Sequence, residues 1–363
     1  YTKIFFDDLD LLNIDRSKIK FPKATEHIPE QIEMIEALEE KGLIYKTLDG
    51  IYFDTSKFDG YGKLGNIDID NLKEGARVEA NEEKKNITDF ALWKFSKPEE
   101  NRQQEWDSPW GKGFPGWHIE CSAMSKKYLG ETFDIHTGGI DHIPTHHNNE
   151  IAQSESVTGK PQANYWLHSN HITIDGEKIS KSIGNTIYLN DLEEKDISPL
   201  AYRYWILTAD YKTLVNFTWD AVTASKTAYE KLINTLSGLP DGGQINSEYK
   251  EKFIEAINDD LNTASGIAIV WELLKDSSIE ESDKKATIFD FDNVLGLNLE
   301  AISNLAKNFK EDIPEEIIQL AEERNEARKS GDFEKSDQIR EKVAQQGYEI
   351  LDDSDGFQIK KKV

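Results

Sequence analysis

The sequence contains a single cysteine, Cys121, among its 363 residues. One cysteine excludes an intrachain disulfide framework and is typical of proteins that work in a reducing cytoplasm. The sequence also has no run of about 20 apolar residues of the kind that spans a bilayer. Its first residues, YTKIFFDD, lack the basic and continuously apolar regions of a secretory signal peptide. We therefore expect a cytoplasmic protein without a membrane segment.

Positive charge is scarce as well, with 43 lysines and arginines against 68 acidic residues and a formal net charge of -25. A protein that binds nucleic acid usually carries a basic surface, because phosphate contacts dominate its affinity. The bulk charge by itself argues against a nucleic-acid partner unless the cations cluster locally. A length of 363 residues predicts about two or three domains. Hydrophobic residues make up 37% of the chain and include eight tryptophans, which is enough to form their cores.

The chemistry is concentrated between residues 116 and 182, which contain GWHIECSAMS, FDIHTGGIDHIPTHHNNEIAQSE and DGEKISKS. His146 and Glu150 are four residues apart in a helix predicted at 146–157, so their side chains project from one face. Together with the thiolate of Cys121 they form a set of three ligands that zinc accepts. The alternative is a buried cysteine beside an unrelated surface pair, because a lone cysteine often packs as a small hydrophobe.

Cys121 lies near the start of a second predicted helix, at 118–129. The partial positive charge at a helix start lowers the pKa of a thiol, which favours the thiolate that binds metal. Apolar runs predict strands at 133–136, 164–168 and 171–174. Strands that alternate with helices in this way are typical of half of a doubly wound α/β unit.

Two short motifs indicate a nucleotide site. Gly138, Gly139 and Asp141 follow a predicted strand, where a glycine pair and an acid suit a ribose at the strand's carboxyl end. The KISKS loop carries Lys178 and Lys181, whose ammonium groups would neutralise the charge that develops when pyrophosphate leaves ATP. Each motif also has a plainer interpretation, as an ordinary strand-Gly-Gly turn and as a solvated lysine turn.

In this order and spacing, GWHIECSAMS, the histidine-rich block and KISKS resemble the cysteinyl-tRNA synthetases, a family of class I aminoacyl-tRNA synthetases. KISKS matches the KMSKS signature of that class with Ile in place of Met, and the resemblance runs along the whole chain. It implies that Cys121, His146 and Glu150 are three of four zinc ligands and that zinc binds the thiolate of substrate cysteine. It also implies that Trp117 lines the amino-acid pocket. The family usually has FPHHENE where this chain has IPTHHNNE.

The resemblance further implies an activity and its partners. Cysteine and ATP, with Mg²⁺, would form cysteinyl-adenylate, and cysteine would then pass to the 3′ end of tRNA(Cys) in translation. Gly138, Gly139 and Asp141 match the adenosine site, and Lys181 matches the lysine that contacts the ATP phosphates. Lys178 and Lys181 would be the catalytic residues, and members of the family are monomers.

The expected fold is α/β plus all-α, with a partial class I, Rossmann-like catalytic domain, an insertion and a helical anticodon-side domain. The first two parts are a connective insertion at 1–95 and the second half of the catalytic fold, with the zinc site and the KISKS loop, at 96–190. Stem-contact helices with a GLPDGG linker follow at 191–243, and an anticodon-binding region with a C-terminal helix pair occupies 244–363. The insertion is predicted to hold a helix at 28–41 and a hairpin of 43–45 with 51–53. Cations near the last helix pair are candidates for tRNA contact, with solvated helix faces as the alternative: Arg324, Arg328, Lys329, Lys335, Arg340 and Lys342.

Members of the family carry a HIGH motif, an opening βαβ unit and a further cysteine that this sequence does not contain. His27-Ile28-Pro29-Glu30 is not a variant of HIGH, because proline stands where ATP needs a glycine and no buried strand precedes it. We therefore expect an N-terminally truncated synthetase that is inactive alone and does not itself supply the fourth zinc ligand. The alternatives are a catalytically inactive tRNA-binding protein and a ligase that joins cysteine to an amino-sugar, although the helices after residue 245 argue against the latter.

Overall fold

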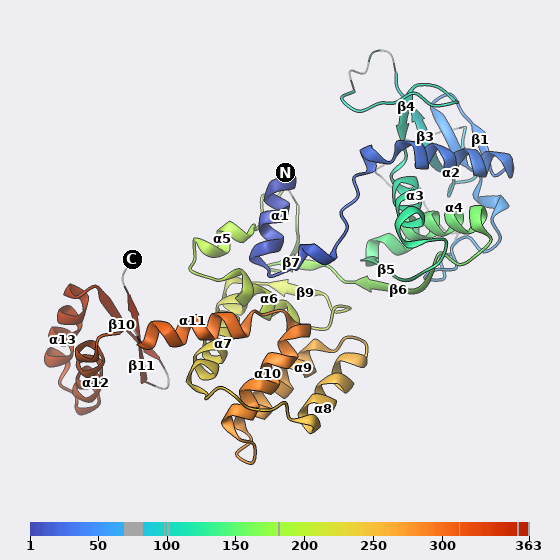
Figure 1. Cartoon of the computed structure of the whole chain (residues 1–363). Coiled ribbons are helices and arrows are strands. Elements are labelled where there is room, and N and C mark those ends of the chain that lie inside the picture. The colour runs from blue at the N-terminus through green and yellow to red at the C-terminus, as the bar shows by residue number, and fades with distance from the viewer. Residues whose placement is uncertain are drawn as a thin grey trace. The chain divides into compact units, whose positions relative to one another are not determined.

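The structure is a computed structural model that describes residues 1–68, 83–97, 99, 102–180, 182–311, 313–353 and 356–361 (Figure 1). The chain divides into two compact units. One unit, here called the site unit, comprises Asp15–Ile187 and Ala209–Thr218. The other, here called the helical unit, comprises Tyr1–Ile14, Tyr188–Thr208 and Trp219–Val363.

The site unit contains an antiparallel sheet with the strand order β1-β2-β3-β4. Its strands are β1 (Ile44–Lys46), β2 (Gly50–Phe53), β3 (Phe90–Phe95) and β4 (Gly113–Pro115). The pairing of β1 with β2 confirms the predicted hairpin. β3 pairs with both β2 and β4, so it joins the hairpin to the strand that leads into the candidate site.

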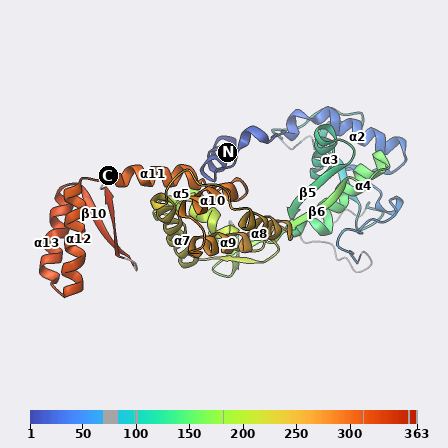
Figure 2. The same ribbon diagram turned by 60° about the horizontal axis from the view of Figure 1, so that its bottom comes forward.

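Three helices of the site unit lie side by side in Figures 1 and 2: α2 (Ile28–Glu40), α3 (Trp117–Leu129) and α4 (Asn148–Thr158). α2 has apolar side chains on one face, spaced three or four residues apart, and it buries Ile28, Met34, Ile35 and Leu38. Its end is marked by Gly42, whose φ of 67° lies in the left-handed region that terminates helices. These side chains join the core that Leu92, Trp93 and Ile119 contribute from β3 and α3.

The remaining strands of the site unit are mainly parallel. β5 (Phe133–Gly139) and β6 (Ala163–Ser169) form a parallel pair that α4 connects. A second sheet has the order β8 (Glu177–Lys178), β7 (Ile172–Ile174) and β9 (Val215–Phe217), in which β7 and β9 are parallel. The three predicted strands are confirmed, and β5 continues three residues further than predicted, up to the glycine pair. Short 3-10 turns lie at Arg16–Lys18, Ala24–Glu26, Thr55–Lys57 and Ile140–His142.

The helix predicted at 146–157 begins differently from the prediction. A π-helical turn covers Ile143–His147, and α4 starts only at Asn148. The turn contains Pro144, which has no backbone N–H to donate to a regular helical hydrogen bond. His146 therefore lies in the wider turn and not on the regular α-helix.

The helical unit is built mostly from helices that follow one another along the chain. They are α1 (Thr2–Leu11), α5 (Leu189–Glu193), α6 (Pro199–Leu207), α7 (Trp219–Gly238), α8 (Ser247–Asn258), α9 (Thr263–Lys275), α10 (Glu281–Leu295) and α11 (Leu299–Glu311). The Arg203 guanidinium donates to the carbonyl oxygens of Leu12 and Leu295 at 2.7 and 2.9 Å, so it ties the N-terminal segment to the end of α10. Within the described ranges, no helix is both long enough and apolar enough to cross a bilayer.

The last part of the chain forms a module of α12 (Glu315–Ser330), α13 (Phe333–Gln345) and a hairpin of β10 (Tyr348–Asp353) with β11 (Gly356–Lys361) (Figure 1). The predicted helix pair and closing strands are confirmed. Arg324, one of the candidates for tRNA contact, lies neither on a solvated helix face nor within reach of a ligand, because its side chain is buried and donates to both carboxylate oxygens of Asp352 at 2.6 and 2.9 Å. Arg324 therefore holds the hairpin on α12.

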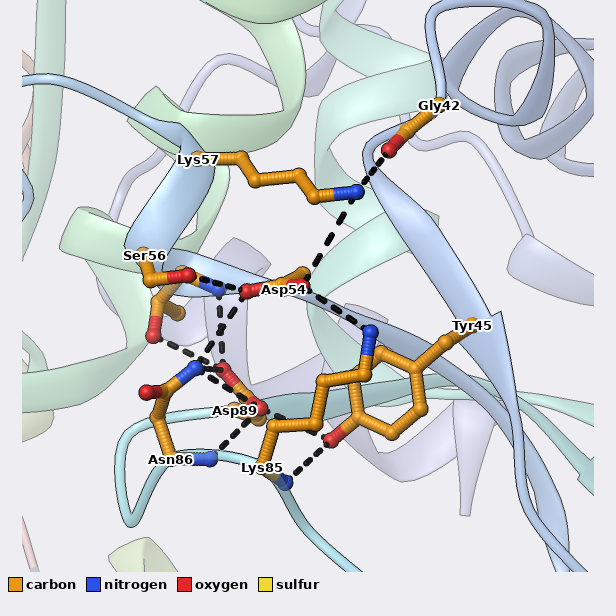
Figure 3. A network of polar contacts seen from close by, with 9 residues as sticks. Gly42, Tyr45, Asp54, Ser56, Lys57, Lys85, Asn86 and Asp89 are labelled. Atoms are coloured by element: carbon orange, nitrogen blue, oxygen red, sulfur yellow. Dashed lines mark hydrogen bonds and ion pairs between the residues drawn. The ribbon is translucent and has the colours of Figure 1, made fainter.

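A buried polar network fixes the return of the chain to β3 (Figure 3). Asp89 accepts hydrogen bonds from the Tyr45 hydroxyl at 2.7 Å and from the backbone N–H of Thr55 at 2.8 Å. The side-chain amide of Asn86 lies 3.2 Å from Asp89 and also 3.2 Å from the second buried carboxylate, Asp54. The network therefore joins the segment before β3 to β1 and to the residues that directly follow β2.

Asp89→Ala should lower the free energy of unfolding by about 3 kcal/mol, because it removes a charged acceptor shared by several buried donors. Asp134→Ala, which removes an exposed carboxylate from β5, should change it by less than about 0.5 kcal/mol. Urea denaturation of the two variants measures the difference. Equal stabilities would contradict the role assigned to the network.

Candidate metal centre and active site

Cys121, His146 and Glu150 converge from three adjoining elements of the site unit. Cys121 lies on α3, His146 in the π-helical turn and Glu150 in the first turn of α4. The Cys121 Sγ, an imidazole nitrogen of His146 and a carboxylate oxygen of Glu150 lie within 4.8 Å of one another. They meet because α3 packs against α4. The structure thus brings together the three residues that the sequence predicts as metal ligands, here called the metal trio.

Glu150 is the buried anion of the metal trio. Burial by itself raises the pKa of a carboxyl, but hydrogen bonds from His136 and His146 outweigh it and lower the pKa of Glu150 to about 2. Its Oε1 lies 3.1 Å from His146 Nε2 and 3.3 Å from His136 Nε2, and Gln162 donates to Oε2 at 3.3 Å. Glu150 also meets His136 and His147 within 4.8 Å. It is ionised at neutral pH and can hold a cation.

Further imidazoles that the sequence interpretation did not single out surround the metal trio. His118 Nδ1 lies 2.9 Å from His146 Nδ1, and His147 Nδ1 lies 2.8 Å from His168 Nε2. Burial lowers the pKa of His118 to about 4 and that of His147 to about 3, so both rings are neutral at pH 7. A signal for this cluster was present in the sequence, since seven of the eight histidines lie between residues 118 and 171.

The thiol of Cys121 does not have the acidity expected at a helix start. Burial raises its pKa to about 12, and the nearby carboxylates of Glu150 and Glu120 add to the effect. Cys121 is the fifth residue of α3, beyond the first turn in which the helix dipole acts. The expectation of a lowered thiol pKa is therefore wrong for the metal-free protein, and metal binding has to release the thiol proton.

Trp117, the first residue of α3, lies beside the metal trio. The centroid of its indole is 4.3 Å from that of the His146 ring and 5.7 Å from that of the His142 ring. The residue is 59% exposed, so part of the indole contacts imidazoles and part borders solvent. The predicted pocket residue and the predicted metal ligands therefore share one site.

Gly138 and Gly139 end β5 next to the histidine cluster. A Cβ atom at Gly138 would lie 2.7 Å from both His142 Nδ1 and His147 Cε1, closer than real contacts allow. Glycine is therefore needed here for the imidazoles to pack against the strand, a reason that the nucleotide interpretation did not include. Asp141 is exposed just beyond the carboxyl end of β5, where the ribose is predicted to bind.

The KISKS loop is a folded turn. Lys178 lies on β8 and is exposed, whereas Lys181 is outside the described residues. Asn185, which the sequence interpretation did not single out, donates to the Lys178 carbonyl oxygen at 3.1 Å and accepts from the Ser180 N–H at 2.9 Å. Among the described residues, no hydrogen bond or ion pair connects this loop with the metal trio. The catalytic and ATP-binding assignments of the two lysines stay predictions.

The chain matches two family models. Residues 1–227 match the class I (C) tRNA synthetase catalytic domain, and residues 252–300 match the DALR domain. Because the first match covers more than half of the chain, the chain belongs to the class I tRNA synthetases. The predicted combination of an α/β catalytic part with a helical part is confirmed.

Within this class, the chain belongs to the cysteine–tRNA ligase family. It is 46% identical over 357 residues to Cysteine–tRNA ligase 1 of Burkholderia lata, a match that covers 98% of this chain and 74% of that protein. It is 40% identical over 368 residues to the cysteine–tRNA ligase of Finegoldia magna, covering 98% and 79% of the two chains. The solved methionyl-tRNA synthetase of Mycobacterium tuberculosis, in complex with methionyl-adenylate, has a TM-score of 0.51 at 12% identity and shares the fold over 83% of this chain and 76% of that one.

Metal binding by the trio should depend on the Cys121 sulfur. Protein loaded with Co²⁺ is expected to show a thiolate-to-cobalt charge-transfer band, because the only thiol of the chain belongs to the trio. Cys121→Ser should abolish the band, whereas His171→Ala, which removes an exposed imidazole outside the trio, should keep it. A band of undiminished intensity in Cys121→Ser would contradict the ligand set.

Proposed function

We propose that this chain acts in cysteine–tRNA ligation, in which ATP activates cysteine as cysteinyl-adenylate and cysteine is then transferred to the 3′ end of tRNA(Cys). The observation that carries the proposal is the convergence of a thiol, an imidazole and a buried carboxylate beside the Trp117 indole. The names of the relatives support it. The DALR match at 252–300 favours a tRNA over an amino-sugar as the acceptor, because an amino-sugar ligase has no anticodon to read.

The residues present fit a zinc ion. Zinc accepts sulfur, nitrogen and oxygen ligands, and the ionised carboxylate of Glu150 supplies charge in a buried site. Cys121, His146 and Glu150 would hold the ion and fill three of its usual four ligand positions. A zinc ion held there would act as a Lewis acid with affinity for the thiolate of substrate cysteine.

Neighbouring residues would orient the amino acid. The exposed part of the Trp117 indole offers an apolar wall beside the metal trio, and it restricts where the cysteine side chain can lie. The neutral imidazoles of His118 and His147 add no positive charge to the pocket, so they do not compete with the ion for the substrate thiolate. The pocket would thus select a short side chain that ends in a thiol.

ATP would bind along the carboxyl end of β5. Asp141 can accept hydrogen bonds from the ribose hydroxyls there, and the predicted adenosine site also includes Gly138 and Gly139. The carboxylate of cysteine attacks the α-phosphorus and pyrophosphate leaves with the electrons of the broken P–O bond. Lys178 and Lys181 would stabilise the negative charge on the departing phosphates, with Mg²⁺ accompanying ATP. No side chain of the protein has to act as a nucleophile.

The tRNA would contact cations of the helical unit. The chain would act in translation, in the cytoplasm, as its family implies. Lys329, Arg340 and Lys342 stay candidates on the last helix pair, whereas Arg328 is a weaker one because its guanidinium forms an ion pair with Asp352 at 2.7 Å. Lys335 is a weaker candidate, because its ammonium group forms an ion pair with Glu323 at 2.7 Å.

Zinc-loaded protein should bind L-cysteine and discriminate against L-serine, because a thiolate is a far better zinc ligand than a hydroxyl group. Trp117→Ala should weaken cysteine binding by about tenfold through loss of the aromatic wall, without changing the zinc content. Phe333→Ala, which removes an exposed aromatic ring from α13, is the matched control. Isothermal titration calorimetry measures each affinity, and equal binding of serine and cysteine would contradict the proposal.

A further inference from the structure

A loop of the site unit is seated on the segment that carries two members of the metal trio. This loop, residues 58–67, is here called the support loop. The Tyr61 hydroxyl donates to Asn149 Oδ1. In the opposite direction, Asn148 Nδ2 donates to the carbonyl oxygen of Leu64 at 3.0 Å. The two asparagines are the first residues of α4 and directly precede Glu150, so the support loop is hydrogen-bonded to the helix start next to the metal trio.

Asn148 connects the support loop with the π-helical turn through one amide group. Its Nδ2 donates to Leu64 O and also, at 2.6 Å, to the carbonyl oxygen of Ile143, the first residue of the turn. Both hydrogens of the amide are thereby used. A carboxylate in the same place would face two carbonyl oxygens with no hydrogen to donate. Gly65 completes the contact, since a Cβ there would overlap the Ile143 side chain.

The contact is buried and excludes water. Asn148 and Asn149 are 2% and 3% exposed, so water cannot replace the hydrogen bonds that they make with the loop. Tyr61 packs against the hydrophobic core of the site unit, which fixes the position of its hydroxyl. Burial also raises the pKa of this phenol, so it stays an O–H donor at neutral pH.

We propose that Tyr61 and Asn148 are positioning residues for the metal trio. Their hydrogen bonds end on the helix start and on the π-helical turn, and not on the ligand atoms. By fixing the rotation of these two segments, they determine where His146 and Glu150 point relative to Cys121 on the neighbouring helix. The inference rests on the proposed metal site, and it adds Tyr61 and Asn148 as residues that position the ligands without binding the metal.

The test separates metal geometry from stability with two matched tyrosine variants. Tyr61→Phe removes the hydroxyl bound to Asn149, and Tyr45→Phe removes a comparable hydroxyl of the same unit, bound to Asp89 at 2.7 Å. Co²⁺ titration in competition with a chelator gives the affinity, and the visible spectrum of the cobalt protein reports the ligand geometry. We expect Tyr61→Phe to weaken the affinity about 10–100-fold and to alter the spectrum. Tyr45→Phe should leave both unchanged.

A second pair of variants changes the amide. Asn148→Asp should weaken Co²⁺ binding about 10–100-fold, because the two carbonyl oxygens lose their donor. Asn258→Asp makes the same chemical change on an exposed residue at the end of α8 and should have no effect. Melting temperatures of all four variants identify any that is unfolded at the temperature of the titration.

The outcomes distinguish the inference from the metal site on which it rests. If Tyr61→Phe binds Co²⁺ with the affinity and spectrum of the unchanged protein, the positioning role is overturned and the metal site stands. If Tyr45→Phe loses as much affinity as Tyr61→Phe, the effect is one of general stability and the inference is again overturned. If the unchanged protein shows no thiolate-to-cobalt band, the proposed metal site fails and the inference fails with it.

Discussion

A carboxylate that is fully removed from water has to be compensated within the protein, and the site unit is organised around one such group, Glu150. Its charge is met by donors from three directions, the imidazoles of His136 and His146 and the amide of Gln162. These partners come from β5, from the π-helical turn and from the segment before β6. The parallel strand pair, the connecting helix and the histidine cluster are therefore parts of one electrostatic arrangement.

The same arrangement gives the site two properties that a metal centre needs. His118 and His147 keep neutral rings because burial lowers the pKa of each imidazole, so they contribute hydrogen bonds to the site without adding positive charge. The Cys121 thiol, close to the Glu150 charge, keeps its proton until a cation replaces it. An ion bound by the metal trio would thus find a site with one negative charge already in place and a second available on deprotonation.

Much of this could be predicted from the sequence, because periodicity and motif spacing act over a few residues. The strands at 133–136, 164–168 and 171–174 and the hairpin before them follow from apolar patterning, and the i, i+4 spacing of His146 and Glu150 brings them together even across a π-helical turn. The Asn148 amide, however, bonds both to the turn and to Leu64, which is 84 residues away in the sequence. Contacts of that kind leave no local pattern.

Burial was the other quantity that the sequence did not reveal. Arg324 has the sequence features of a tRNA-binding cation, but its place against Asp352 is decided by the fold of the whole module. The thiol pKa is raised where the sequence predicts a lowered one for the same reason, since Cys121 is buried and lies beyond the first turn of α3. The net charge of -25 argued against a nucleic-acid partner, yet the chain belongs to a family of tRNA ligases, because net charge describes the whole surface and not its local patches.

The central claim is that the metal trio binds zinc and presents it to the thiolate of substrate cysteine. X-ray absorption at the zinc edge, recorded on zinc-loaded protein without and with L-cysteine, tests it directly. The account predicts one sulfur neighbour at about 2.3 Å in the protein alone and two after cysteine is added, with L-serine causing no change. A sulfur count that stays the same when cysteine binds, or a zinc shell without sulfur, would contradict it.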